Sequence, residues 1–300
     1  MGTDPEPLGE PVQLLAKSSQ EVAPDLFQAY PKTYSAPSIC VPFRQEMPDR
    51  LDAVNAFYVR PPKGSLMLLA ELREQVLHAN REISRRGLAP HTWGNVSGID
   101  RSGSQPLVII KPSGVDYATM SASDLVITDL DGKTVEGTLR PSSDLDTHTL
   151  LYREFPQIGG VVHTHSEFAT AWAQANRAIP CLGTTHADYF YGPIPVTRPL
   201  TAEEVEEAYV RNTGAVITSH FRANNLDPIA VPGVLVAGHA PFAWGKTAIA
   251  AVENADVLEY VARMAFRSTL LGAPETGIPS YVRDHHYLRK HGPKATYGQR

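Results

Sequence analysis

Two histidines separated by a single threonine, His163 and His165, constrain this chain more than any other feature. They follow a glycine and valine run at 159–162, which favours a β-strand and places both side chains on one face of it. A third histidine, His239, follows another apolar run at 231–237. An isolated pair can simply form hydrogen bonds, but three converging imidazoles would bind a divalent metal and leave one position open, as a catalytic zinc requires.

Composition limits the class of partner. The 300 residues are 42% hydrophobic, enough for the core of one domain with an appendage. A net charge of −5 with no long basic run argues against nucleic acid and favours a small-molecule partner. Cys40 and Cys181 are too few for a disulfide framework, and the sequence shows neither a membrane span nor a signal peptide. We therefore expect a soluble cytoplasmic protein that does not act at a membrane.

Proline divides the chain into two regions. Residues 1–63 contain ten of the 25 prolines and show no sustained hydrophobic period, so we expect an extension that is partly irregular or disordered. Residues 64–300 show regular patterns and are expected to form a folded domain.

Hydrophobic periodicity predicts the helices and strands of this domain. Helices are expected between Ser65 and Gly87 and at 144–155, 167–176, 201–224, 246–271 and 279–291. Strands are expected at 96–100, 106–112, 125–129, the run before His163, and 231–237. Ser166 should cap one helix and a capping box of Thr201 and Glu204 another, with a break near Gly214. Because strands occur both consecutively and between helices, the order indicates an α+β fold or a layered α/β/α arrangement with a mixed sheet.

Several further residues are candidates for chemistry. Three turns rich in glycine and serine, at 93–97, 111–114 and 141–144, could together form a nest for an anion such as phosphate, although each alone is an ordinary turn. Asp144 ends the third turn, where it could either cap a helix or act in a site. Asp188 stands among aromatic residues and is a candidate for proton transfer.

These segments together resemble the L-ribulose-5-phosphate 4-epimerases of the class II aldolase/adducin superfamily. The resemblance runs from about Leu66 to Gln299 and excludes the N-terminal extension. The motifs that carry it are Asn95 in its Gly-Asn-Val-Ser turn and the segments 110–117, 141–144, 163–165, 183–192, 241–246 and 287–292. The resemblance implies a class II aldolase-like catalytic domain at 64–300, with a three-layer α/β/α fold and a mixed, largely antiparallel sheet. It also implies a homotetramer whose active sites are shared between subunits.

Carried over by position, the resemblance implies a role for each site residue. His163, His165 and His239 become the ligands of one zinc ion per subunit, with Asp144 at or beside the metal. Asp188 and Tyr297 become acid/base groups on opposite sides of the sugar, with His286 and Arg289 as supporting residues near Tyr297. The residues around the substrate phosphate are Gly94, Asn95, Ser113, Gly114, Ser142 and Ser143. One departure is Ala237, where many such epimerases carry another histidine.

The implied reaction interconverts L-ribulose 5-phosphate and D-xylulose 5-phosphate by cleavage and re-formation of the C3–C4 bond. The C4 hydrogen of a 2-ketose is not acidic, so a retro-aldol step with a Lewis acid is easier than deprotonation. Two alternatives remain: a class II aldolase that releases its fragments, of the L-fuculose 1-phosphate type, and a non-catalytic adducin-like module. Asp188 in its segment and Tyr297 match the epimerase pattern, and the adducin-like module has no need for three histidines.

Overall fold

The structure, a computed structural model, describes residues 67–296. The predicted extension at 1–63 and the predicted acid/base residue Tyr297 lie outside the described residues. Within the described part, no helix combines the length and the apolar character that a membrane crossing would need.

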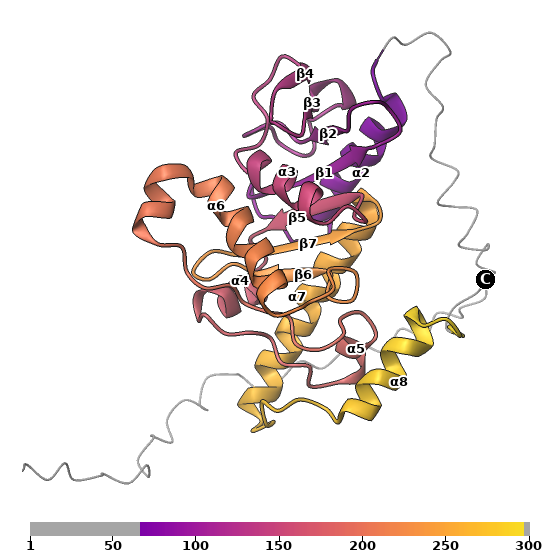
Figure 1. Cartoon of the computed structure of the whole chain (residues 1–300), viewed down its shortest axis with the longest axis vertical. Helices are drawn as coiled ribbons and strands as arrows, with labels where there is room; N and C mark the ends of the chain where they lie inside the picture. The colour runs from indigo at the N-terminus through magenta and orange to yellow at the C-terminus, as the bar shows by residue number, and fades with distance from the viewer. Residues whose placement is uncertain (1–66, 297–300) are drawn as a thin grey trace, which may run out of the picture. The chain divides into compact units, whose positions relative to one another are not determined.

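A seven-stranded sheet forms the centre of this part (Figure 1). Its strands are β1 (Gly94–Asp100), β2 (Leu107–Ile110), β3 (Val126–Asp129), β4 (Thr134–Glu136), β5 (Gly160–Thr164), β6 (Gly233–Leu235) and β7 (Pro241–Gly245). The order is β4-β3-β2-β1-β5-β7-β6, and every ladder between these strands is antiparallel.

The largely antiparallel character expected of the sheet is confirmed. Short connections between β1 and β2 and between β3 and β4 return the chain in the opposite direction, whereas parallel neighbours need long crossovers. Among the described residues, parallel pairing is limited to an isolated bridge between Val196 and Leu235. The sheet therefore contains less parallel pairing than the alternation of strands and helices suggested.

Helices cover both faces of the sheet (Figure 1). They are α2 (Ala70–Arg85), α3 (Leu145–Glu154), α4 (Glu167–Gln174), α5 (Thr184–Ala187), α6 (Ala202–Ala223), α7 (Ala248–Leu270) and α8 (Ser280–His291), with a 3-10 turn at Ala122–Asp124. On one face α2 packs on β1, and α7 on β5 and β7. On the other face α3 and α6 pack against each other, with Phe155 and Phe221 against Trp244 of β7. The three-layer α/β/α arrangement follows from this packing.

The strand that carries His163 lies directly against α7. A Cβ atom on Gly160 would lie 2.5 Å from the backbone of Ala248, so only glycine allows this close approach. Side chains alternate along a strand, so His163 points to the opposite face from Gly160, the face that α3 and α6 cover. Asn95 of β1 is paired with His163 across the ladder and projects from the same face.

Most predicted helices are present within a few residues of their expected bounds, but α6 differs. The capping box of Thr201 and Glu204 is confirmed at its start. The break lies at Ala208, with φ −164° and ψ 70°, and not near Gly214. Gly214 is helical and buried, because its missing side chain lets α6 approach Leu150 of α3 closely.

Two other local predictions need correction. Ser166 precedes α4, but its side chain makes no cap hydrogen bond. Instead, the carboxylate of Glu259 on α7 accepts hydrogen bonds of 2.9 Å from the N–H groups of Phe168 and Ala169. The strand expected at 231–237 is limited to β6, because the chain then turns through Gly238 (φ 69°) into β7. That turn carries His239.

Candidate functional site

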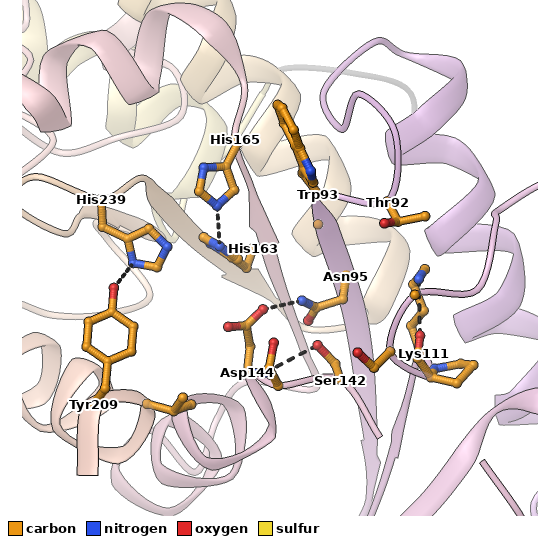
Figure 2. Close-up of a pocket in the computed structure, with 16 residues that line it drawn as sticks. Thr92, Trp93, Asn95, Lys111, Ser142, Asp144, His163, His165, Tyr209 and His239 are labelled. Carbon is orange, nitrogen blue, oxygen red and sulfur yellow. Dashed lines mark hydrogen bonds between the residues drawn. The ribbon is translucent and has the colours of Figure 1, made fainter. Parts of the chain in front are cut away.

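Three histidines converge at the ends of adjacent strands (Figure 2). His163 lies near the end of β5, His165 just beyond it, and His239 in the turn between β6 and β7. One ring nitrogen of each lies within 4.8 Å of those of the other two. The Nε2 atoms of His163 and His165 are 3.2 Å apart. Two ligands of a tetrahedral zinc with Zn–N bonds of about 2.0–2.1 Å are roughly 3.3 Å apart, so these donors fit one ion.

The surroundings of the imidazoles favour metal binding. The carbonyl oxygen of Pro241 accepts a hydrogen bond of 3.0 Å from His163 Nδ1, which leaves the Nε2 lone pair directed at the cluster. Burial lowers the pKa of His165, and burial together with the neighbouring His163 and His165 lowers the pKa of His239 to about 4. Neutral imidazoles are the form that binds a metal.

Asp144 lies beside the three histidines in the same cavity. It precedes α3, but its carboxylate does not cap the helix; Oδ2 accepts a 2.6 Å hydrogen bond from Asn95 Nδ2. Burial acts to raise the pKa of Asp144, but His163, His148 and the Asn95 amide outweigh it, so the pKa is lowered. Among the described residues, the candidate ligand atoms that all lie within 4.8 Å of one another come from the three histidines. Asp144 is not part of this group. Its place at or beside the metal stays a prediction.

The three predicted segments line one cavity of about 680 Å³ together with the histidines (Figure 2). The first of them was expected to be a turn at 93–97, but it is mostly strand, because β1 begins at Gly94 and pairs with β5 from that residue on. All six residues expected around a phosphate are part of this lining: Gly94, Asn95, Ser113, Gly114, Ser142 and Ser143. Two backbone hydrogen bonds hold the second and third turns together. The N–H of Ser113 donates to the carbonyl oxygen of Arg140, and the N–H of Ser142 donates to the carbonyl oxygen of Lys111. Gly94 adopts φ 154°, and a Cβ there would lie 2.9 Å from the carbonyl oxygen of His163. The geometry brings the turns together, and their role in phosphate binding stays a prediction.

Lys111 begins the second predicted segment and lines the cavity, although no role of its own was predicted for it. Its side chain is only 2% exposed, and Nζ donates to the carbonyl oxygen of Pro112 at 3.1 Å and lies 5.0 Å from the ring centre of Tyr117. Burial lowers the pKa of Lys111. A lysine directly after the apolar strand β2 was the available signal, because a lysine is seldom fully buried unless it is paired.

Tyr209 of α6 is a lining residue that the sequence analysis missed. Its hydroxyl lies 3.2 Å from His239 Nδ1 (Figure 2). Burial, followed by the charge of Asp144, raises the pKa of Tyr209. No periodicity or motif marks this residue, because its position depends on the break in α6 at Ala208.

Asp188 belongs to a different group of side chains. It follows α5, and its carboxylate contacts His286 Nδ1 and Arg289 Nη2, each at 3.1 Å. His291 Nε2 donates to the Asp188 carbonyl oxygen at 2.8 Å. His286 and Arg289, which were expected to support Tyr297, thus contact the other expected acid/base residue. Within the described residues, the lining of the metal cavity includes no residue of α5 or α8.

The antiparallel sheet between helical layers, with three histidines at its strand ends, defines a class II aldolase-like protein. The chain belongs to the class II aldolase and adducin family, because the family's N-terminal domain matches residues 74–266.

Three solved structures illustrate the likeness in fold. An L-fuculose 1-phosphate aldolase is 23% identical, with a TM-score of 0.63 over 75% of this chain and 99% of that one. YgbL from Klebsiella pneumoniae is 22% identical, with a TM-score of 0.56 over 73% and 99%. An L-fuculose-1-phosphate aldolase from Thermus thermophilus is 23% identical, with a TM-score of 0.53 over 68% and 98%. At these identities the likeness concerns the fold alone.

Proposed function

We propose that this protein is a zinc-dependent enzyme that breaks and re-forms a carbon–carbon bond in a phosphorylated ketose. The observation that carries the proposal is the convergence of His163, His165 and His239 on a cavity lined by the serine and glycine turns. Three imidazole nitrogen donors suit zinc, and the open position of such a site receives a substrate. The specific reaction that we propose is the interconversion of L-ribulose 5-phosphate and D-xylulose 5-phosphate.

The reaction starts when a base removes the proton of the C4 hydroxyl group. The C3–C4 bond then breaks, its electron pair stays on C3 as the enediolate of dihydroxyacetone, and C4 becomes the aldehyde of glycolaldehyde phosphate. When bound, zinc supplies a Lewis acid for the ketose C2 and C3 oxygens. After the aldehyde turns, C3 attacks its other face, and the new C4 alkoxide takes up a proton. Because the alkoxide forms on opposite faces in the two epimers, the reaction needs two proton-transferring groups.

The cavity residues have two tasks in this mechanism. Ser113 and Ser142 offer hydroxyl groups to the phosphate, and the buried cation of Lys111 lies beside them. Holding glycolaldehyde phosphate by its phosphate keeps it in the cavity while its aldehyde turns. The carboxylate of Asp144, held by Asn95, faces the same space and can accept hydrogen bonds from substrate hydroxyl groups.

The proton-transferring groups that we propose are Asp188 and Tyr297. Asp188 is outside the cavity of its own chain, so we propose that a neighbouring subunit supplies it and that the active enzyme is a homotetramer with shared sites. The contacts of Asp188 with His286 and Arg289 hold the carboxylate, which is 19% exposed, between α5 and α8 and outside the cavity beside the three histidines.

A second candidate is an aldolase that releases its two fragments. Two of the similar structures carry the name L-fuculose 1-phosphate aldolase, and the proposed metal and phosphate sites would serve that reaction equally. The segment from His186 to Gly192 with Asp188, together with Tyr297, matches the epimerase pattern and favours the epimerase. The three histidines and the polar cavity beside them argue against a purely structural, adducin-like module.

One assay separates these candidates. Zinc-loaded protein is incubated with L-ribulose 5-phosphate or with L-fuculose 1-phosphate, and products are followed by NMR with and without a chelator. An epimerase forms D-xylulose 5-phosphate without accumulating fragments, and the chelator abolishes turnover. Release of dihydroxyacetone phosphate and L-lactaldehyde from L-fuculose 1-phosphate, with no epimer from the pentulose, would establish the aldolase instead. Zinc-loaded protein that turns over neither substrate would overturn the proposal.

A further inference from the structure

Each metal-site histidine needs a partner that fixes which ring nitrogen faces the metal. For His163 that partner is the carbonyl oxygen of Pro241, a backbone group. His239 lies in a turn, and its Nδ1 is hydrogen-bonded to a side chain instead, the hydroxyl group of Tyr209 at 3.2 Å. The other ring nitrogen of His239 points toward His163 (Figure 2). Ala237, two residues before His239, has no polar side chain to take this place.

The break in α6 explains how Tyr209 reaches His239. Ala208 has non-helical angles, and Tyr209 is the first residue after it. The backbone that follows is fixed, because Thr213 Oγ1 donates to the Tyr209 carbonyl oxygen at 2.9 Å and Thr147 Oγ1 donates to that of Val210 at 2.6 Å. The side chain therefore leaves α6 in a defined direction, into the cavity.

We propose that Tyr209 is a positioning residue of the metal site, whose hydroxyl oxygen accepts the Nδ1 proton of His239 and keeps its Nε2 lone pair directed at the metal. This inference rests on the proposed metal-dependent function. A neutral imidazole that carries its proton on Nδ1 has its free lone pair on Nε2, as ligation requires. Without this bond, His239 can turn or adopt the other tautomer, because no other hydrogen bond to its ring exists among the described residues. Partners of metal-binding histidines typically change metal affinity by about 10–100-fold.

The first test is the zinc affinity of Tyr209→Phe, measured by competition with a chromophoric chelator. We expect the dissociation constant to rise by about 10–100-fold, while the circular dichroism spectrum and the urea unfolding curve stay unchanged, since the ring is retained. Tyr260→Phe, at an exposed tyrosine on α7, is the matched control and should bind zinc like the wild type. An unchanged dissociation constant for Tyr209→Phe would overturn the inference.

The second test examines His239 directly in the metal-free protein. Imidazole ¹⁵N chemical shifts distinguish a protonated from an unprotonated ring nitrogen. We expect His239 in the wild type to carry its proton mainly on Nδ1, and in Tyr209→Phe to show a mixture of tautomers. Identical spectra in both proteins would refute the positioning role. If the wild type binds no zinc, the proposed function fails as well, whereas equal zinc binding by the wild type and the variant refutes only the role of Tyr209.

Discussion

At the scale of single residues, the candidate metal site consists of three imidazoles in a partly buried cavity. Phe242 stacks on His163 with ring centres 4.2 Å apart and limits how far that ring can rotate. The pKa values of His165 and His239 are lowered chiefly by burial, so neither needs to lose a proton near neutral pH before binding a metal.

The first prediction concerns the ligands themselves. His163→Ala and His239→Ala should each lose most of the bound zinc and the activity together, because two remaining nitrogens form a much weaker site. The fold should persist, since the core does not depend on the metal. Elemental analysis and circular dichroism measure these outcomes, with His78→Ala, an exposed histidine on α2, as the control. Full zinc occupancy in both ligand variants would refute the assignment.

The second prediction concerns pH and a histidine outside the metal cluster. Burial lowers the pKa of His186 to about 4, and its Nε2 donates to the Gly192 carbonyl oxygen at 2.8 Å. Below about pH 6.5 the unfolded chain binds a proton at this histidine that the folded protein does not bind until about pH 4. Stability should therefore fall as the pH decreases from about 6.5 to 4.

His186→Gln, which retains a donor for Gly192, should remove about 1 kcal/mol per pH unit from this dependence. Urea unfolding at several pH values, with chelator present throughout, measures the slope. The exposed His78→Gln should leave it unchanged. A slope that is the same in His186→Gln and in the wild type would contradict the prediction.

The site residues that the sequence predicted depend on local structure, whereas the site residues that it did not predict depend on tertiary structure. The His163 and His165 pair is local, since strand periodicity alone brings the two rings together. Lys111 and Tyr209 are defined by tertiary structure: a lysine becomes informative only when its burial is known, and the tyrosine reaches His239 through a helix break that has no glycine or proline.

At the scale of elements, the position of β5 is determined by its contact with α7. The backbone of Ala248 occupies the space that a side chain at position 160 would need. The sequence predicted β5 and α7 correctly, but it did not predict β7, because a segment that starts with proline and ends with glycine has weak strand propensity. Burial between β5 and β6, with Trp244 in the core, overrides that propensity.

The third prediction tests this contact. Gly160→Ala should destabilise the protein by about 1–3 kcal/mol, because the new methyl group forces β5 and α7 apart. Gly183→Ala is a matched control, since a Cβ there meets no atom within 4 Å. Urea unfolding gives both values. A Gly160→Ala variant as stable as the control would show that the contact between α7 and β5 can relax without cost.

At the scale of the whole molecule, the candidate catalytic groups form two sets that do not meet within the described part of one chain. One set surrounds the three histidines, and the other joins Asp188 to His286 and Arg289. The proposed cyclic homotetramer would resolve this separation, because each subunit could then bring its second set to the first set of its neighbour. The resemblance to the epimerases implied shared sites, whereas the motifs by themselves give only the order of residues along the chain and not the distance between the two sets.

The fourth prediction follows from a shared site. Asp188→Asn should retain zinc but lower the turnover number by about 10²–10⁴-fold, the range for a positioned proton-transferring group. His239→Ala should be inactive because it lacks the metal. Hybrids are made by co-expressing the two variants equally. A site in a hybrid is intact when the Asp188→Asn chain supplies its three histidines and the His239→Ala chain supplies its aspartate. Random assembly in a cyclic ring makes about one quarter of the sites intact, so the hybrids should recover about a quarter of the wild-type activity.

The control for this experiment is a mixture of the two variants purified separately and combined under conditions where subunits do not exchange, which should remain inactive. If Asp188 instead acts in the site of its own chain, every site in the hybrids lacks either the metal or the aspartate, and co-expression recovers nothing. A fully active monomer in light scattering would lead to the same conclusion, because one chain alone would then have to bring its two sets of residues together. Recovery of activity therefore requires both that Asp188 takes part in catalysis and that it acts across a subunit boundary.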